Sequence, residues 1–217
     1  MRLEPLPYRD ARRFHEGLSE EDCIRMYCIA SGIPAYHEVM AGRTVEGAIE
    51  NAILSPVGVL REEVENLVAM ELKPKELYIS ILGSISGGKT DLKTISESSD
   101  VDRTTCLKAL SNLELIGIVR RDSPYHNAKR FAYVISDGFV RFHYDVLSQG
   151  EMTLGISDSR SLYQALRGYI QTFYGNRFED VCRQYIVSNN ACRWVGRWWG
   201  TVPVVKDGKP VRDDDGR

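Results

Sequence analysis

Residues 83–90, with the sequence GSISGGKT, are of the types that bind nucleotide phosphates in many ATPases. The stretch fits the pattern G-x-x-x-x-G-K-[ST] at every fixed position, so Lys89 and Thr90 would contact the phosphates and a magnesium ion. Such a loop needs a buried strand before it and a helix after it, because amides at the start of that helix hold the phosphates. The chemistry therefore depends on the surrounding elements.

The residues before this motif favour a helix rather than a strand. Their apolar positions are separated by steps of one and three residues, whereas a half-buried strand would alternate. These positions are Leu77, Tyr78, Ile81, Leu82 and Ile85. The predicted helix runs into the motif and ends at Gly87 and Gly88. A P-loop nucleotidase remains only as an alternative, because no series of strand–helix units follows, and the nearest acid after a strand is Asp137.

Two further helices and a hairpin are predicted after the motif. Residues 91–98 form a short helix, and residues 103–116 form a longer one, capped near Asp102 and ended by Gly117. The inward residues predicted for the longer helix are Cys106, Leu107, Leu110, Leu113 and Ile116. Residues 118–122 and 130–136 alternate as the two strands of a hairpin do. Three helices followed by a hairpin predict a winged helix-turn-helix over residues 76–136.

The outward side of this unit carries residues suited to DNA. Lysine and arginine contact phosphates, whereas threonine, serine and asparagine contact phosphates or base edges. The helix offers Arg103, Thr104, Lys108, Ser111 and Asn112, and the hairpin offers Arg120, Arg121, His126, Lys129 and Arg130. Acids at positions 97, 100, 102, 114 and 122 dilute this positive patch. Double-stranded DNA is the predicted partner, and a protein-interaction role for the same unit is the alternative.

The composition is that of a globular protein with reduced thiols. The chain has 217 residues and a formal charge of −2, so any basic face is local. Its 5 cysteines include no C-x-x-C pair, which argues against a disulfide framework or a zinc cluster. The N-terminus lacks the apolar run of a signal peptide, and no segment approaches the length of a membrane span. A cytoplasmic protein without bound metal is expected.

Helices are predicted on both sides of the winged unit. Before it they occupy residues 8–30 in two pieces, the second capped by Ser19, and then residues 35–41, 44–53 and 59–71. After it, residues 136–147 begin a helix, and residues 161–187 form a long helix that is broken at Gly175. The inward residues predicted for its second part are Phe178, Val181, Cys182, Tyr185 and Ile186. The predicted fold class is mainly α with a small β wing.

The end of the chain and the histidines carry weaker signals. Trp194, Trp198 and Trp199 lie in a predicted strand and are expected in a core, and residues 206–209 signal a hairpin turn. The histidines at positions 15, 37, 126 and 143 are scattered, and none pairs with an acid at ligand spacing. Surface or loop roles are therefore expected for them.

Several segments, taken together, resemble one protein family. They are LEPL at 3–6, SGIP at 31–34, ISDGFVRFHY at 135–144, RFEDVCRQYI at 177–186 and VGRWW at 195–199. In this order they resemble the C-terminal half of the archaeal-type AAA+ ATPases of prokaryotes, from the STAND-like branch. The resemblance implies four parts. These are a helical lid (1–60), a connecting helix (61–75), a winged helix (76–136), and the first part of a domain similar to PD-(D/E)XK nucleases (137–217).

The resemblance also implies what this chain lacks. The ATPase core of the family would precede Met1, so ATP and magnesium belong to the intact parent, and this chain itself is expected to hold no cofactor. In the parent, Pro34 would touch the nucleotide base and Glu179 would lie at the nuclease-like site. The acidic strand and the E-x-K strand of the family do not occur before Arg217. A non-catalytic fragment is therefore expected, with the missing ATPase core as a partner and an oligomeric state left open.

Overall fold

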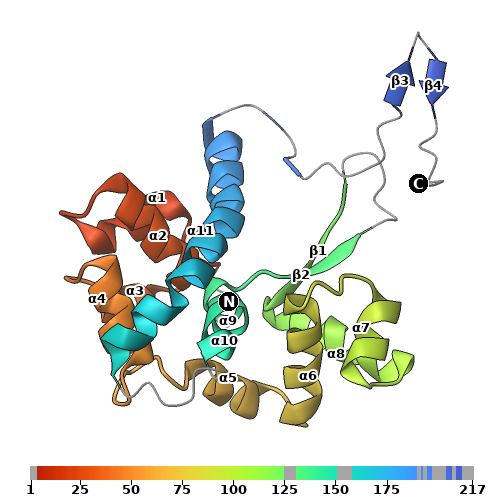
Figure 1. The fold of residues 1–217 in the computed structure, drawn as a ribbon, viewed down its shortest axis with the longest axis horizontal. Coiled ribbons are helices and arrows are strands. Elements are labelled where there is room, and N and C mark those ends of the chain that lie inside the picture. The colour runs from red at the N-terminus through yellow and green to blue at the C-terminus, as the bar shows by residue number, and fades with distance from the viewer. Residues whose placement is uncertain are drawn as a thin grey trace.

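The computed structural model describes residues 4–124, 131–150 and 158–189, together with residues 192, 195–196, 204–206 and 209–211. Within these residues the protein is mainly α-helical with a small antiparallel hairpin (Figure 1), as the sequence predicts. The 5 cysteines all lie in the described part and are free thiols. Among the described residues, no helix has both the length and the apolar character needed to cross a bilayer.

The N-terminal part is built from short helices. They are α1 (Tyr8–Ala11), the 3-10 helix η1 (Arg12–His15), α2 (Glu20–Ala30), α3 (Pro34–Met40), α4 (Val45–Ala48), the π-helix η2 (Ile49–Leu54) and α5 (Glu63–Glu71). The predicted cap of α2 is confirmed, because Oγ of Ser19 accepts a hydrogen bond from the amide of Asp22 at 3.1 Å.

The helix predicted over 59–71 is shorter in the structure and begins at Glu63. The preceding loop turns back on η2, and the amide of Leu60 donates to the carbonyl of Ala52 at 2.8 Å. A side chain at Gly58 would lie 2.6 Å from that carbonyl oxygen, so the turn approaches η2 too closely for any residue but glycine. Val59, the first residue of the predicted helix, is exposed in this loop.

Three helices and the hairpin follow. They are α6 (Lys75–Ser86), α7 (Leu92–Ser99), α8 (Arg103–Ile116), β1 (Val119–Asp122) and β2 (Ala132–Ile135). The strands pair antiparallel, with Val119 opposite Ile135 and Asp122 opposite Ala132. These elements match the order and the positions predicted from the sequence.

The chain continues as α9 (Gly138–Phe142), the π-helix η3 (His143–Leu147), α10 (Ser148–Gly150), and the 31-residue helix α11 (Ser159–Asn189). The short strands β3 (Val204–Lys206) and β4 (Lys209–Val211) pair around the predicted turn. The predicted break of the long helix at Gly175 is wrong. Buried Phe173, Tyr174 and Arg177 flank that glycine, so tertiary packing maintains the helix through it.

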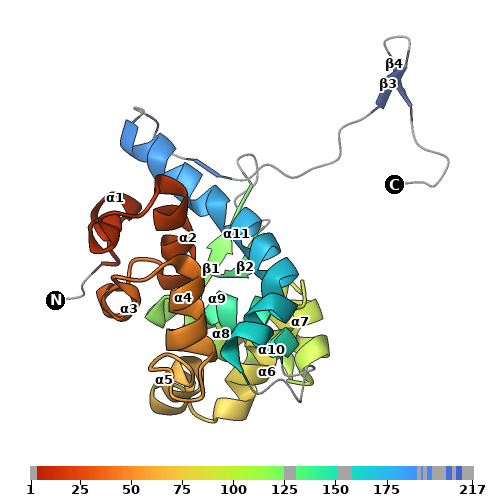
Figure 2. The same ribbon diagram turned by 60° about the vertical axis from the view of Figure 1, so that its left-hand side comes forward.

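A single hydrophobic core joins the N-terminal helices, the helices α6–α8, the β1–β2 hairpin and α11. Its buried residues run from Ala11 in α1 to Val181 in α11, and Figure 2 shows α11 crossing the N-terminal helices. Of the inward set predicted for the second half of α11, Val181 is buried, whereas Phe178 and Tyr185 are exposed. Trp194, Trp198 and Trp199, which are predicted to lie in a strand and in a core, fall outside the described residues.

Candidate nucleic-acid interface

Residues 75–136, called the helix–hairpin unit below, position the predicted interface. Asp91 and Asp102 cap α7 and α8, and each carboxylate accepts hydrogen bonds from two amides of the first helical turn at 3.0–3.1 Å. Gly117 ends α8 with a φ of 86°, a left-handed conformation that is accessible to glycine at little cost. These local signals define where the outward side of α8 begins and ends.

The GSISGGKT stretch is not arranged as a phosphate-binding loop. Residues 83–86 belong to α6, and the residues that follow make the turn to α7. The amides of residues 87, 88 and 89 donate to carbonyl groups in the last turns of α6 at 2.9–3.1 Å. Because they end a helix, they do not converge on an anion. The carbonyl of Thr90 accepts a hydrogen bond from the amide of Tyr133 at 2.8 Å, which holds the turn beside β2.

The buried side of α8 differs in part from the prediction. Cys106, Ala109, Leu110 and Leu113 are buried. Leu107 and Ile116, which were predicted to face inward, are 42% and 39% exposed. Successive helical residues are rotated by about 100°, which places 107 and 116 at opposite edges of the buried side. The small Ala109 is buried as well, which the sequence did not suggest.

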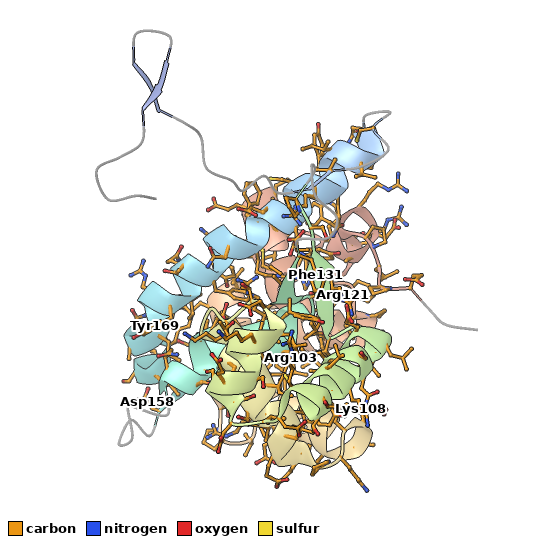
Figure 3. The ribbon with its side chains drawn as sticks, turned by 90° about the vertical axis from the view of Figure 1, so that its right-hand side faces the viewer. Arg103, Lys108, Arg121, Phe131, Asp158 and Tyr169 are labelled. Atoms are coloured by element: carbon orange, nitrogen blue, oxygen red, sulfur yellow. The ribbon has the colours of Figure 1, made fainter. Side chains whose placement is uncertain are left out.

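The outward side of α8 matches the prediction more closely. Arg103, Thr104, Lys108 and Ser111 are all exposed, and Figure 3 labels Arg103 and Lys108 on this helix. No ion pair joins either cation to another residue of the described part of the chain. Asn112 is less free, because its amide donates to the hydroxyl of Tyr78 in α6 at 2.9 Å.

The two arginines of β1 are held by acids of neighbouring helices. Nη2 of Arg120 lies 2.9 Å from Oδ1 of Asp180 in α11. Arg121 makes a two-pronged pair with Glu114 of α8, with Nε–Oε1 and Nη2–Oε2 distances of 2.9 Å, and its guanidinium lies 4.7 Å from the ring centroid of Phe131 (Figure 3). The charge of each arginine is thus partly compensated by a carboxylate, although both side chains stay partly exposed. The acid at position 114 was visible beside the positive patch in the sequence, but nothing there indicated Asp180.

Three further predicted contacts, His126, Lys129 and Arg130, lie outside the described residues. Conversely, the structure adds two cations at the start of α7. Lys89 and Lys93 are both exposed, and the Nζ of Lys93 lies 3.9 Å from the exposed carboxylate of Glu97. The helix-turn-helix pattern offered a signal for them, because the first helix of such a motif crosses the DNA backbone.

The two residues singled out by the family resemblance lie on the surface. Pro34 is exposed at the first position of α3, where its fixed φ suits a helix start. Glu179 is an exposed residue of α11, and its Oε2 lies 3.7 Å from Nη2 of Arg183. Neither position by itself forms a binding or catalytic site.

Three of the four histidines are paired, contrary to expectation. Nε2 of His15 lies 2.8 Å from Nδ1 of His37, and both rings are almost fully buried. His143 lies 3.7 Å from the carboxylate of Glu65. Nε2 of His37 is 2.8 Å from the carbonyl oxygen of Ser31, so this nitrogen donates and Nδ1 of His37 accepts from His15. Burial lowers the pKa of both rings in the buried pair, that of His15 to about 4.

Comparisons with known proteins add one distant relative. An uncharacterized protein of Methanocaldococcus jannaschii is 23% identical over 211 residues, which cover 92% of this chain and 47% of that protein. The chain therefore spans about half the length of this relative. No family model matches the chain. No solved structure matches it either.

Proposed function

We propose that the helix–hairpin unit is a winged helix-turn-helix that binds double-stranded DNA, with α8 in the major groove. The observation that carries the proposal is the exposed row of Arg103, Thr104, Lys108 and Ser111 on α8. Such residues supply phosphate contacts and base contacts from one side of a recognition helix. Lys89 and Lys93 extend the positive surface along the start of α7 and would contact the backbone.

In the same proposal Arg120 and Arg121 contribute less to DNA binding than the cations of α8. Each is already bound by a carboxylate at 2.9 Å, which offsets its charge. Their expected role is to hold the hairpin between α8 and α11. Lys129 and Arg130 remain candidates for backbone contacts from the hairpin.

Fluorescence anisotropy with a labelled duplex, measured across salt concentrations, tests the proposal. We expect weak, mostly non-specific binding, roughly micromolar at moderate salt. Arg103→Ala combined with Lys108→Ala should weaken binding to all sequences and reduce the salt slope by about 2, one for each lost phosphate contact. Arg9→Ala is the matched control, because Arg9 is an exposed arginine on α1, away from the helix–hairpin unit. Equal binding by the double variant and the control would exclude α8 as the DNA surface.

A second candidate function is protein binding by the same helix. Leu115 is 70% exposed, and Leu107 and Ile116 are also partly exposed along α8. Exposed leucines of this kind suit a helix that packs against a partner protein. Absence of DNA binding at low salt, together with self-association or partner binding that is lost in Leu107→Ser/Leu115→Ser, would favour this function.

The wider context that we propose is a larger ATPase of the AAA+ type. Its support is the order of the segments LEPL, SGIP, ISDGFVRFHY, RFEDVCRQYI and VGRWW. The matched relative has more than half of its length outside the aligned region, enough for an ATPase core. In that setting ATP and magnesium would bind to the ATPase core, and Pro34 and Glu179 would act together with that core and the nuclease-like domain.

A further inference from the structure

The turn at residues 31–34 and the hairpin are connected by a continuous chain of polar contacts. It starts at Ser31, whose Oγ accepts a hydrogen bond from Nη2 of Arg177 at 3.1 Å. Nη1 of Arg177 lies 2.8 Å from Oδ2 of Asp180, and the other oxygen of that carboxylate binds Arg120 in β1 at 2.9 Å. Two side chains of α11, Arg177 and Asp180, thus link Ser31 at the end of α2 to Arg120 in the first strand of the hairpin.

Ser31 is held in an unusual backbone conformation at the start of this chain. It is one of two described non-glycine residues with a positive φ, at 51°, and its ψ is −133°. Such a conformation is unfavourable for a residue with a side chain and persists only where the surroundings enforce it. Here the amide of Gly138 donates to its Oγ at 2.8 Å, and Nε2 of His37 contacts its carbonyl oxygen at 2.8 Å. The turn therefore depends on contacts from α3, α9 and α11.

Arg177 contacts both ends of the connection. In addition to Ser31 and Asp180, its Nη1 lies 3.3 Å from the carbonyl oxygen of Ser136, the residue that follows β2. The side chain is buried, and its Nε has no hydrogen-bond partner among the described residues. A buried charge with one close carboxylate is expensive to disturb, since losing one partner leaves the charge uncompensated. A shift of the Ser31 turn must therefore reorganise Asp180 and the arginines bound to it.

We propose that Ser31, Arg177, Asp180 and Arg120 form a conformational relay, through which displacement of the 31–34 turn loosens the hairpin. The relay does not depend on what the hairpin or the turn binds. It gives any ligand or partner that acts on the 31–34 turn a physical route to the helix–hairpin unit. No hydrogen bond or ion pair among the described residues joins Ser31 to Arg120 directly, so coupling between these two side chains is not expected from direct contact.

A double-mutant cycle tests the relay with the whole chain. Ser31→Ala and Arg120→Gln are made singly and together, and urea unfolding measures each folding equilibrium constant. Each single variant should lower the folding equilibrium constant by some factor. If the relay exists, the factor for the double variant should be smaller than the product of the two single factors, by about threefold or more. In the background of Asp180→Asn this coupling should disappear. Ser86→Ala with Arg120→Gln is the matched control, because the Ser86 hydroxyl binds Asp145, outside the relay, at 2.7 Å.

Amide hydrogen exchange provides the second measurement, which holds even if the double variant folds poorly. Ser31→Ala alone should speed exchange at residues 119–122 and 132–135 by about threefold or more, whereas Ser86→Ala should not. The relay is wrong if the double variant lowers the folding equilibrium constant by the product of the two single factors, within experimental error. It is equally wrong if Ser31→Ala speeds exchange only near residues 27–40 and 138 and leaves the hairpin unchanged.

Discussion

At the scale of single residues, the buried histidine pair shows most directly how the surroundings of a side chain determine its protonation. His15 and His37 share one hydrogen bond, and Nδ1 of His15 is buried without a partner among the described residues. With both rings neutral, Nε2 of His37 donates to the carbonyl oxygen of Ser31. An additional proton on either ring would place a positive charge in the core. His37 is thus part of the contacts that hold the 31–34 turn.

The free energy of unfolding should therefore depend on pH through this pair. The folded-state pKa of His15, about 4, is below its unfolded value of 6.5, so the unfolded chain takes up the proton first as the pH falls. The contribution of neutral His15 to the free energy of unfolding is fully present above about pH 6.5. Acidification removes it, and the loss reaches about 2–3 kcal/mol at pH 4. Urea unfolding between pH 7.5 and pH 4 measures this loss. His15→Gln should flatten the dependence, and parallel curves for the variant and the wild type would contradict the assignment.

At the scale of elements, local signals predicted most boundaries correctly. Ser19, Asp102 and Gly117 act within a few residues of themselves, so their capping roles could be predicted from the sequence. The partner of Arg120 could not be predicted, because Asp180 is 60 residues away and pairing at that distance depends on tertiary packing. The exposure of Leu107 escaped prediction for a similar reason. An edge position on a helix is buried or exposed according to its neighbours.

The long helix offers a direct test of an incorrect prediction. A side chain added at Gly175 would meet no atom within 4 Å, and the residue lies inside α11. Gly175→Ala should raise the free energy of unfolding by about 0.5–1 kcal/mol, because alanine loses less backbone entropy in a helix. Thermal or urea unfolding measures the change.

Gly138→Ala is the matched comparison for that variant. There the new Cβ would lie 2.3 Å from Oγ of Ser31, so the free energy of unfolding should fall by more than about 2 kcal/mol. A destabilised Gly175→Ala protein would show that the helix is interrupted at this glycine, as the sequence alone suggested.

At the scale of the whole molecule, the continuous core predicts cooperative unfolding. The four parts suggested by the family resemblance share one cluster of buried residues, and α11 packs against α2, η2 and η3. Thermal unfolding should therefore be a single transition, with calorimetric and van't Hoff enthalpies that agree. Far-UV and tyrosine near-UV circular dichroism should give the same midpoint, because Tyr27, Tyr133 and Tyr174 are buried in three different parts. Earlier melting of the helix–hairpin unit would show that it is a separate domain.

The hydrogen bond between Ser31 and Gly138 also affects how the protein is made. The two residues are 107 positions apart, and Arg177, the next partner of Ser31, is 146 positions away. At a translation rate of about 5–20 residues per second, the first helices emerge from the ribosome at least about 5 s before the contacts that complete them. During that interval Met26 and Ile29, which are fully buried in the finished protein, are exposed to solvent and to chaperones. Nascent chains of this protein should therefore depend on chaperones until α11 has been synthesised.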